Sequence, residues 1–110
     1  MIRNYIENAN FEDTGFHYPL SLISGKHKMV ILYCLMDFQV VRFNELKRYL
    51  QNISDKTLSN NLTELEADEL NVRTEYPQIP PKVAYTLSDR GKSMMAVLDQ
   101  LCVWGENNRP

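Results

Sequence analysis

The run Met29–Met36 is the feature that most constrains the fold, because it is hydrophobic throughout. At helical period such a run presents hydrophobic side chains around nearly its whole circumference, which predicts a helix buried on most sides. The run is far shorter than the ~20 residues that a membrane-spanning helix needs. We therefore expect it to form the central helix of a globular core.

The chain of 110 residues has the size of one ordinary globular domain. It can bury roughly two-thirds of its unfolded surface, which is enough for one core and leaves little for an enclosed active site. The sequence has no phosphate-binding glycine loop and no nucleophile-elbow motif. Its histidines, His17 and His27, belong to no cluster with metal-ligand spacing. We therefore expect no enzyme, no metal and no cofactor.

The start of the chain and its cysteines bear on location. The first residues, MIRNYIENANFED, lack the basic and then apolar pattern of a secretory signal. Cys34 and Cys102 are too few for a disulfide-stapled secreted domain. Both observations favour a cytoplasmic protein without a membrane partner.

Charge is unevenly distributed along the chain. The formal net charge is −2, which argues against indiscriminate coating of nucleic acid. Residues 19–63 nevertheless carry six basic side chains against three acidic ones, and the acidic side chains gather before and after this segment. An acidic chain of this kind can still present a basic face.

Helix start and stop signals, together with the spacing of apolar residues, predict four helices in the first two-thirds of the chain. Pro19 suits the first position of a short helix through Ile23, and Gly25 stops it before the central helix begins near Lys26. A third, amphipathic helix carries apolar residues at steps of three, four and three, namely Phe43, Leu46, Leu50 and Ile53. Ser54 can cap a fourth helix, one side of which is lined by Leu58, Leu62 and Leu65. Two amphipathic helices joined by so short a turn indicate a helix-turn-helix.

The apolar residues then recur with a period of two, around Val72 and again over Val83–Leu87, and this alternation predicts two strands. The loop Tyr76–Pro81 between them contains three prolines, so we expect it to project from the hairpin as a wing. Ser88 can cap a last helix through Trp104. This helix carries a wide apolar stripe that needs a partner, made of Met94, Val97, Leu98, Leu101 and Cys102.

Several segments together resemble the HxlR family of winged-helix transcriptional regulators, which are similar to the MarR type. They are Ile23–Lys26, Arg42–Leu46, Ile53–Leu58, Leu62–Asp68 and Tyr76–Leu87, and the match runs from about residue 19 to residue 95. The resemblance implies an α+β fold: a winged helix-turn-helix with a β-hairpin wing and a C-terminal dimerisation helix. It also implies a homodimer that presents two recognition helices to a palindromic operator. We expect an arm over 1–18, the DNA-binding domain over 19–87 and the dimerisation helix and tail over 88–110.

The chain departs from the family pattern at four places. Thr14 and Gly15 stand where members have a Cys-Pro pair whose cysteine senses oxidants in some of them, so thiol sensing at that position is excluded. His27 replaces a usual Trp, and Asn61 replaces a common Arg, which removes a phosphate contact. Glu69 replaces a usual Gly, and a positive φ there would cost roughly 1 kcal/mol.

The candidate DNA contacts lie on the fourth helix, on the third helix and in the wing. Asn60 is the best candidate for reading a base through its bidentate amide. Ser54 can present a phosphate to the free amides of the helix start. Lys26 and Lys28 are interpreted as surface charges. The complete set is Ser54, Lys56, Thr57, Ser59, Asn60, Thr63, Lys82, Arg42, Lys47 and Arg48.

Two interpretations of this set stay open. The first is a sequence-specific dimeric regulator, repressor or activator, that binds double-stranded DNA with a recognition helix over 55–67 and a wing over 73–87. The alternative is a winged-helix module for protein contact, in which the polar helix face is merely solvated. Cys34 and Cys102 are interpreted as packing residues, although a redox role for either is not excluded, and a small-molecule effector is possible.

Overall fold

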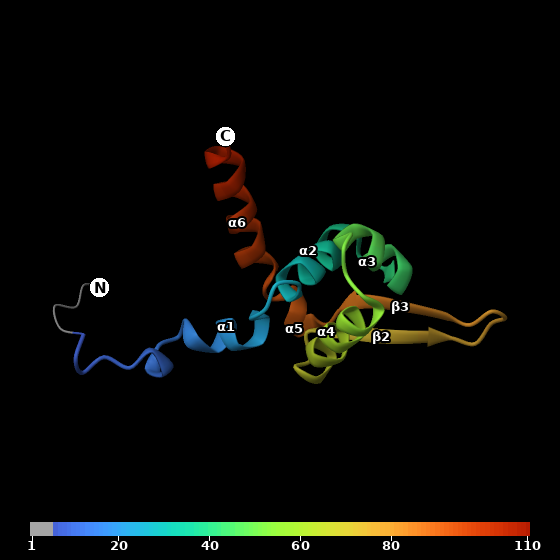
Figure 1. Ribbon diagram of the computed structural model, residues 1–110, viewed down its shortest axis with the longest axis horizontal. Helices are drawn as coiled ribbons and strands as arrows, with labels where there is room; N and C mark the ends of the chain where they lie inside the picture. Colours follow the sequence, from blue (N-terminus) through green and yellow to red (C-terminus); the bar gives the residue numbers. More distant parts are fainter. Residues whose placement is uncertain (1–5) are drawn as a thin grey trace.

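The computed structural model describes residues 6–110, and it has the predicted winged helix-turn-helix architecture (Figure 1). A short 3-10 helix, η1 (Phe11–Asp13), lies in the N-terminal segment, whose residues 1–5 fall outside the described part. The remaining elements follow in the order α1 (His17–Ile23), α2 (Lys28–Phe38), β1 (Val41–Arg42), α3 (Phe43–Leu50), α4 (Asp55–Ala67), β2 (Asn71–Tyr76), β3 (Lys82–Leu87), α5 (Asp89–Lys92) and α6 (Met95–Asn108).

Helix α2 occupies the centre of the core, as the apolar run predicts. Ile31, Leu32 and Leu35 are at most 1% exposed, because α3, α4 and β3 all pack against this helix. From α4 the residues facing the core are the three leucines of the predicted stripe, Leu58, Leu62 and Leu65. These contacts determine which face of α4 points away from the core.

The two long strands form the wing, and a third strand completes the sheet. The order is β1-β3-β2 and all neighbours are antiparallel, with β2 and β3 paired from Asn71↔Leu87 to Tyr76↔Lys82. Because β3 is central, its middle residues Ala84 and Tyr85 are both buried. Beyond the last pair, the loop 77–81 extends away from the helices, as predicted (Figure 1).

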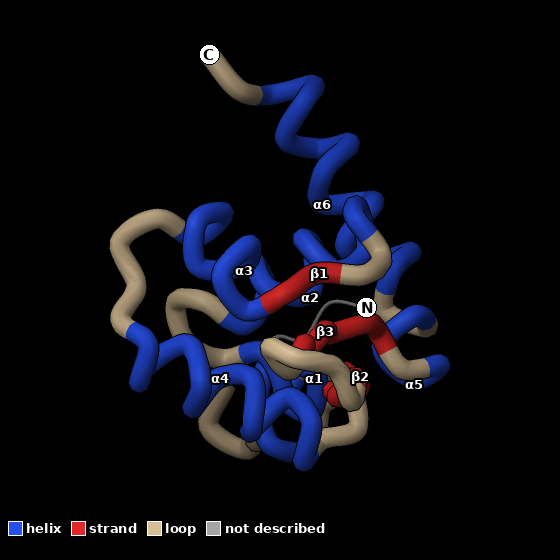
Figure 2. Tube along the Cα trace, turned by 90° about the vertical axis from the view of Figure 1, so that its right-hand side faces the viewer, coloured by secondary structure: helices blue, strands red, loops and turns tan. Residues whose placement is uncertain are grey.

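Strand β1 was not anticipated from the sequence. It consists of Val41 and Arg42, which pair with Tyr85 and Ala84 of β3, and Figure 2 shows it lying beside β3 at the start of α3. Two residues are too few to display a period of two, so alternation could not indicate this strand.

The first helix begins earlier than predicted. It starts at His17 and not at Pro19, which occupies its third position. The first N–H groups of a helix have no intrahelical partner, so the missing N–H of proline is tolerated there.

The prediction of one continuous C-terminal helix was wrong, because α5 and α6 are separated at Ser93 and Met94. The N–H of Ser93 donates to both Asp89 O and Arg90 O, at 3.1 Å each, and its hydroxyl donates to Arg90 O at 2.5 Å. Such shared and side-chain bonds tighten the backbone and compete with the regular ladder. After the break α6 packs against α2 through the buried Leu98, and its C-terminal part projects from the domain body (Figure 1).

Ser88 joins the end of the wing to the end of α4. As predicted it caps the helix that follows, since its hydroxyl accepts from Gly91 N at 2.9 Å. The same hydroxyl donates to Glu69 O at 2.5 Å, and Ser88 N donates to Leu70 O at 3.1 Å. Gly91 lies so close to this junction that a Cβ on it would come within 2.1 Å of Leu70 O.

Glu69 adopts the left-handed conformation that the family supplies with glycine, with φ at 60°. Glu69→Gly should therefore raise the free energy of unfolding by about 0.5–1 kcal/mol, because relief of the left-handed penalty exceeds the added entropy of the unfolded chain. Urea unfolding measures the change. Asp68→Gly is the matched control, because Asp68 has φ at −82° and should only lose stability. An equal loss of stability in both variants would contradict the assignment of strain to Glu69.

Candidate nucleic-acid interface

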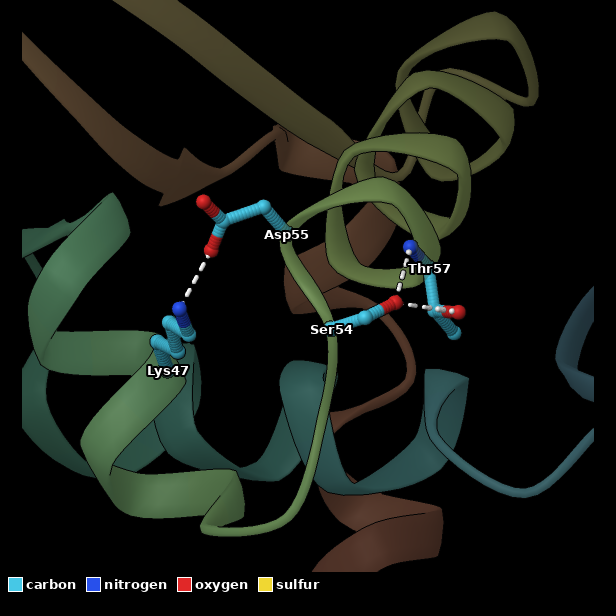
Figure 3. A network of polar contacts seen from close by, with 4 residues as sticks. All are labelled: Lys47, Ser54, Asp55 and Thr57. Atoms are coloured by element: carbon cyan, nitrogen blue, oxygen red, sulfur yellow. Dashed lines mark hydrogen bonds and ion pairs between the residues drawn. The ribbon is translucent and has the colours of Figure 1, made fainter.

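The N-terminus of α4 is held by Ser54 and by an ion pair with α3 (Figure 3). The Ser54 hydroxyl accepts from Thr57 N at 3.1 Å, which confirms the predicted cap, and donates to Thr57 Oγ1 at 2.9 Å. Lys47 of α3 lies 2.5 Å from the Asp55 carboxylate in the first turn of α4. The two helices of the helix-turn-helix are thus joined by a polar contact beside the turn that connects them.

The outward face of α4 carries the polar side chains singled out in the sequence. Lys56, Ser59, Asn60 and Thr63 are all exposed, because the leucine stripe turns the opposite face into the core. Lys56 has no ion-pair partner among residues 6–110. Asn61, by contrast, donates its amide to Thr57 O at 2.8 Å and is directed back along its own helix. The amide of Asn60 is therefore the better placed of the two for an external partner.

A groove of about 960 Å³ separates α3 from the wing. Four cationic side chains line it, one from β1, two from α3 and one from the wing; they are Arg42, Lys47, Arg48 and Lys82. Glu45 also lines the groove, but its carboxylate accepts from Arg42 N at 2.9 Å and so caps α3. All four cations that the sequence assigned outside α4 thus meet in one place. Such a groove suits a polyanionic backbone.

A smaller hollow of about 220 Å³ lies between α4 and the strands and reveals site residues that sequence reasoning missed. Ser59 and Thr63 line it together with Glu66 and Arg73 of β2. Arg73 is paired with Tyr85 of β3, which also lines this hollow, and its approach to α4 depends on the packing of the sheet. Gln51 and Gln78, which line the larger groove, were likewise missed.

The interpretation of Lys28 as a surface charge was wrong. The residue is 8% exposed, and its ammonium lies 2.6 Å from the Glu64 carboxylate on α4. The pair joins α2 to the side of α4 and so helps to fix the orientation of that helix. It leaves Lys28 outside the set of cations facing the groove.

The C-terminal stripe is divided between the core and the surface. Leu98 is 4% exposed and belongs to the domain's own core, against which Met94 also packs. Val97, Leu101 and Trp104 remain 57%, 52% and 68% exposed. The exposed part of α6 is thus a hydrophobic surface.

The two thiols have different surroundings. Cys34 is buried in α2, and desolvation raises the pKa of its thiol to about 11. Cys102 is half-buried, with its Sγ 3.7 Å from the hydroxyl of Tyr33, and that contact raises the pKa of the tyrosine to about 12. Within residues 6–110 neither cysteine forms a disulfide.

Two other kinds of site are absent from the part of the chain that the structure describes. Over residues 6–110 no three His, Cys, Asp or Glu side chains converge so as to hold a metal ion. Among the helices described above, none is both long enough and apolar enough to cross a membrane.

Comparisons with known proteins agree with this geometry. The family model of the HxlR-like helix-turn-helix matches residues 22–110. An HTH-type transcriptional regulator of Halalkalibacterium halodurans is 54% identical over 100 residues, which are 91% of this chain and 88% of that protein. The HTH-type transcriptional regulator YdzF of Bacillus subtilis is 49% identical over 90 residues, covering 82% of this chain and 83% of that one.

Among solved structures, the redox regulator HypR in its oxidized form superposes with a TM-score of 0.82 at 37% identity, covering 88% of this chain and 99% of that one. The curated relatives are regulators and not enzymes, in agreement with the expectation from the sequence. The match over most of its length shows that this chain belongs to the HxlR-like helix-turn-helix family.

Proposed function

We propose that the protein is a sequence-specific transcriptional regulator that binds double-stranded DNA in the cytoplasm as a homodimer. The observation that carries this proposal is the exposed polar face of α4, whose first turn is joined by the Asp55–Lys47 ion pair to a groove with four cationic side chains. An α-helix fits the major groove, whereas lysine and arginine side chains neutralise phosphates. The neighbouring wing extends far enough from the helices to reach an adjacent part of the duplex (Figure 1).

Within this interface the side chains have different tasks. Asn60, with its free amide, reads a base edge, and Ser59 and Thr63 on the same exposed face contribute further hydrogen bonds. Lys56, Arg42, Arg48 and Lys82 contact phosphates. Ser54 and Thr57 keep the helix N-terminus ordered, and Lys47 is shared between Asp55 and the backbone of the DNA.

The dimer is proposed to form through α6. Its exposed apolar residues Val97, Leu101 and Trp104 lie together on one helix that stands away from the body, and a second copy would cover them. Cys102 lies at the edge of this surface, whereas Met94 and Leu98 support it from the core. A two-fold axis would present two copies of α4 to a palindromic operator, with half-sites one helical turn or a multiple apart.

Lys56 and Asn60 should respond differently to truncation. Lys56→Ala should weaken binding to selected and random DNA alike and lower the slope of log K against log salt by ~1 per half-site, because one phosphate contact is lost. Asn60→Ala should cost ~1–3 kcal/mol on the selected operator and leave random DNA and the salt slope unchanged. Fluorescence anisotropy over a salt series measures both effects.

Asn61→Ala is the matched control, because its amide is bonded within α4. Equal losses on both DNAs for Asn60→Ala would exclude it from base recognition. DNA binding whose affinity did not depend on salt concentration would favour the protein-interaction alternative, since an apolar interface releases no counterions.

Leu101→Asp should convert the dimer to a monomer of 12.9 kDa while the fold is kept, because a carboxylate would be buried in the interface. Light scattering on the intact wild-type chain should give about twice that mass. Val40→Asp is the control, since Val40 is 54% exposed, close to the 52% of Leu101, but lies outside α6 and lines a hollow with Phe38 and Tyr49. A monomeric wild type would refute the dimer.

Mild oxidation should leave DNA binding unchanged. The thiolate is the form that attacks peroxide, and a Cys34 pKa near 11 keeps that thiol protonated at neutral pH. Thr14 stands where other members of the family have a sensing cysteine. Anisotropy before and after peroxide treatment tests this. A loss of binding that dithiothreitol reverses, and that Cys102→Ser abolishes, would assign sensing to Cys102 instead.

A further inference from the structure

The tip of the wing carries an isolated hydrophobic side chain. Ile79 is fully exposed, at 101%, and it lies in the middle of the loop 77–81 beyond the last strand pair, Tyr76↔Lys82. Gln78, Pro80 and Pro81 line the groove that faces α3, whereas Ile79 does not. Its side chain therefore points out of the domain at the tip of the β2–β3 hairpin.

The loop around Ile79 is stiff and uncharged. Three of its five residues are prolines, which have a restricted φ, and Gln78 N donates to Tyr76 O at 2.9 Å. The cations of the wing lie behind the tip. Lys82 Nζ is 5.0 Å from the centroid of the Tyr76 ring, and the Arg73 guanidinium lies 3.7 Å from the Glu75 carboxylate. The tip thus presents an apolar group on a rigid support, at little cost in ordering entropy.

The dimensions of DNA determine what such a tip can contact. The minor groove of B-DNA is about 6 Å wide. Two paired strands are about 5 Å apart before their side chains are added, so the hairpin cannot enter, but one side chain at its tip can. Apolar side chains of this type are known to enter the minor groove in other DNA-binding proteins.

We propose that Ile79 packs against the floor of the minor groove beside the site read by α4, and thereby selects A·T over G·C pairs at that position. The proposal rests on the DNA binding proposed above. Guanine places its 2-amino group in the minor groove, whereas A·T pairs present only acceptors there. Isoleucine offers no acceptor, so a G·C pair under it leaves a covered donor without a partner, which is unfavourable.

Inosine provides the test, because an I·C pair lacks the 2-amino group and leaves the major-groove edge unchanged. An operator duplex is first selected from random DNA with the full-length protein, and footprinting locates the base pairs beneath the wing. Duplexes with G·C, I·C or A·T at those pairs are then compared by anisotropy. The wild type should bind the I·C and A·T duplexes alike and the G·C duplex about tenfold more weakly.

Variants of the wing separate direct contact from DNA shape. Ile79→Ala should bind the G·C and I·C duplexes equally, and Ile79→Val should keep most of the discrimination. Val72→Ala is the matched control, because it removes exposed apolar surface from β2 and leaves the tip intact, so its discrimination should equal that of the wild type. Since Ile79 is fully exposed, Ile79→Ala and Ile79→Val should melt at the wild-type temperature.

The outcomes distinguish the two proposals. Discrimination that persists in Ile79→Ala would come from groove shape and would overturn the role of Ile79. Equal wild-type binding to the G·C and I·C duplexes would also overturn the role of Ile79, but it would leave the proposed DNA binding intact. A protein that bound no duplex at all would overturn both.

Discussion

The packing of the α4 leucine stripe against α2 is the contact on which the rest of the structure depends. Leu58 and Leu65 are completely buried, and burial of each such side chain contributes about 1.5–3 kcal/mol. The same contact orients α4, since leucines on one side leave Lys56 and Asn60 on the other. Lys28 and Glu64 reinforce this orientation from α2. Stability and the direction of the polar face therefore have one physical origin.

Charge and fold work together in an otherwise acidic molecule. The groove between α3 and the wing brings Arg42 and Arg48 close to Lys82, although the whole chain has a net charge of −2. Because exposed charges separated by more than a Debye length of about 8 Å are largely screened at physiological ionic strength, the local set matters more than the total. The phosphate backbone of a duplex bound as proposed would experience mainly these nearby cations.

Elements with a clear period were predictable from the sequence, and those created by tertiary contacts were not. The apolar run Met29–Met36 predicted α2, and Ser54 and Ser88 cap helices as their positions in the sequence indicated. Strand β1 was missed because two residues show no alternation. Lys28 was assigned to the surface because its partner Glu64 is distant in sequence. In the site, the exposure of Asn60 followed from the leucine spacing, whereas the approach of Arg73 to α4 required the sheet.

The close contact at Gly91 has a mechanical consequence. With Leu70 O in the space that a Cβ would need, α5 is pressed onto the end of α4 and the two helices form one joint. Helix α6 leaves this joint after Ser93 and Met94 and is held against α2 by the buried Leu98. In the dimer proposed above, the distance between the two copies of α4 would therefore be set by contacts that lie outside the polar face of α4.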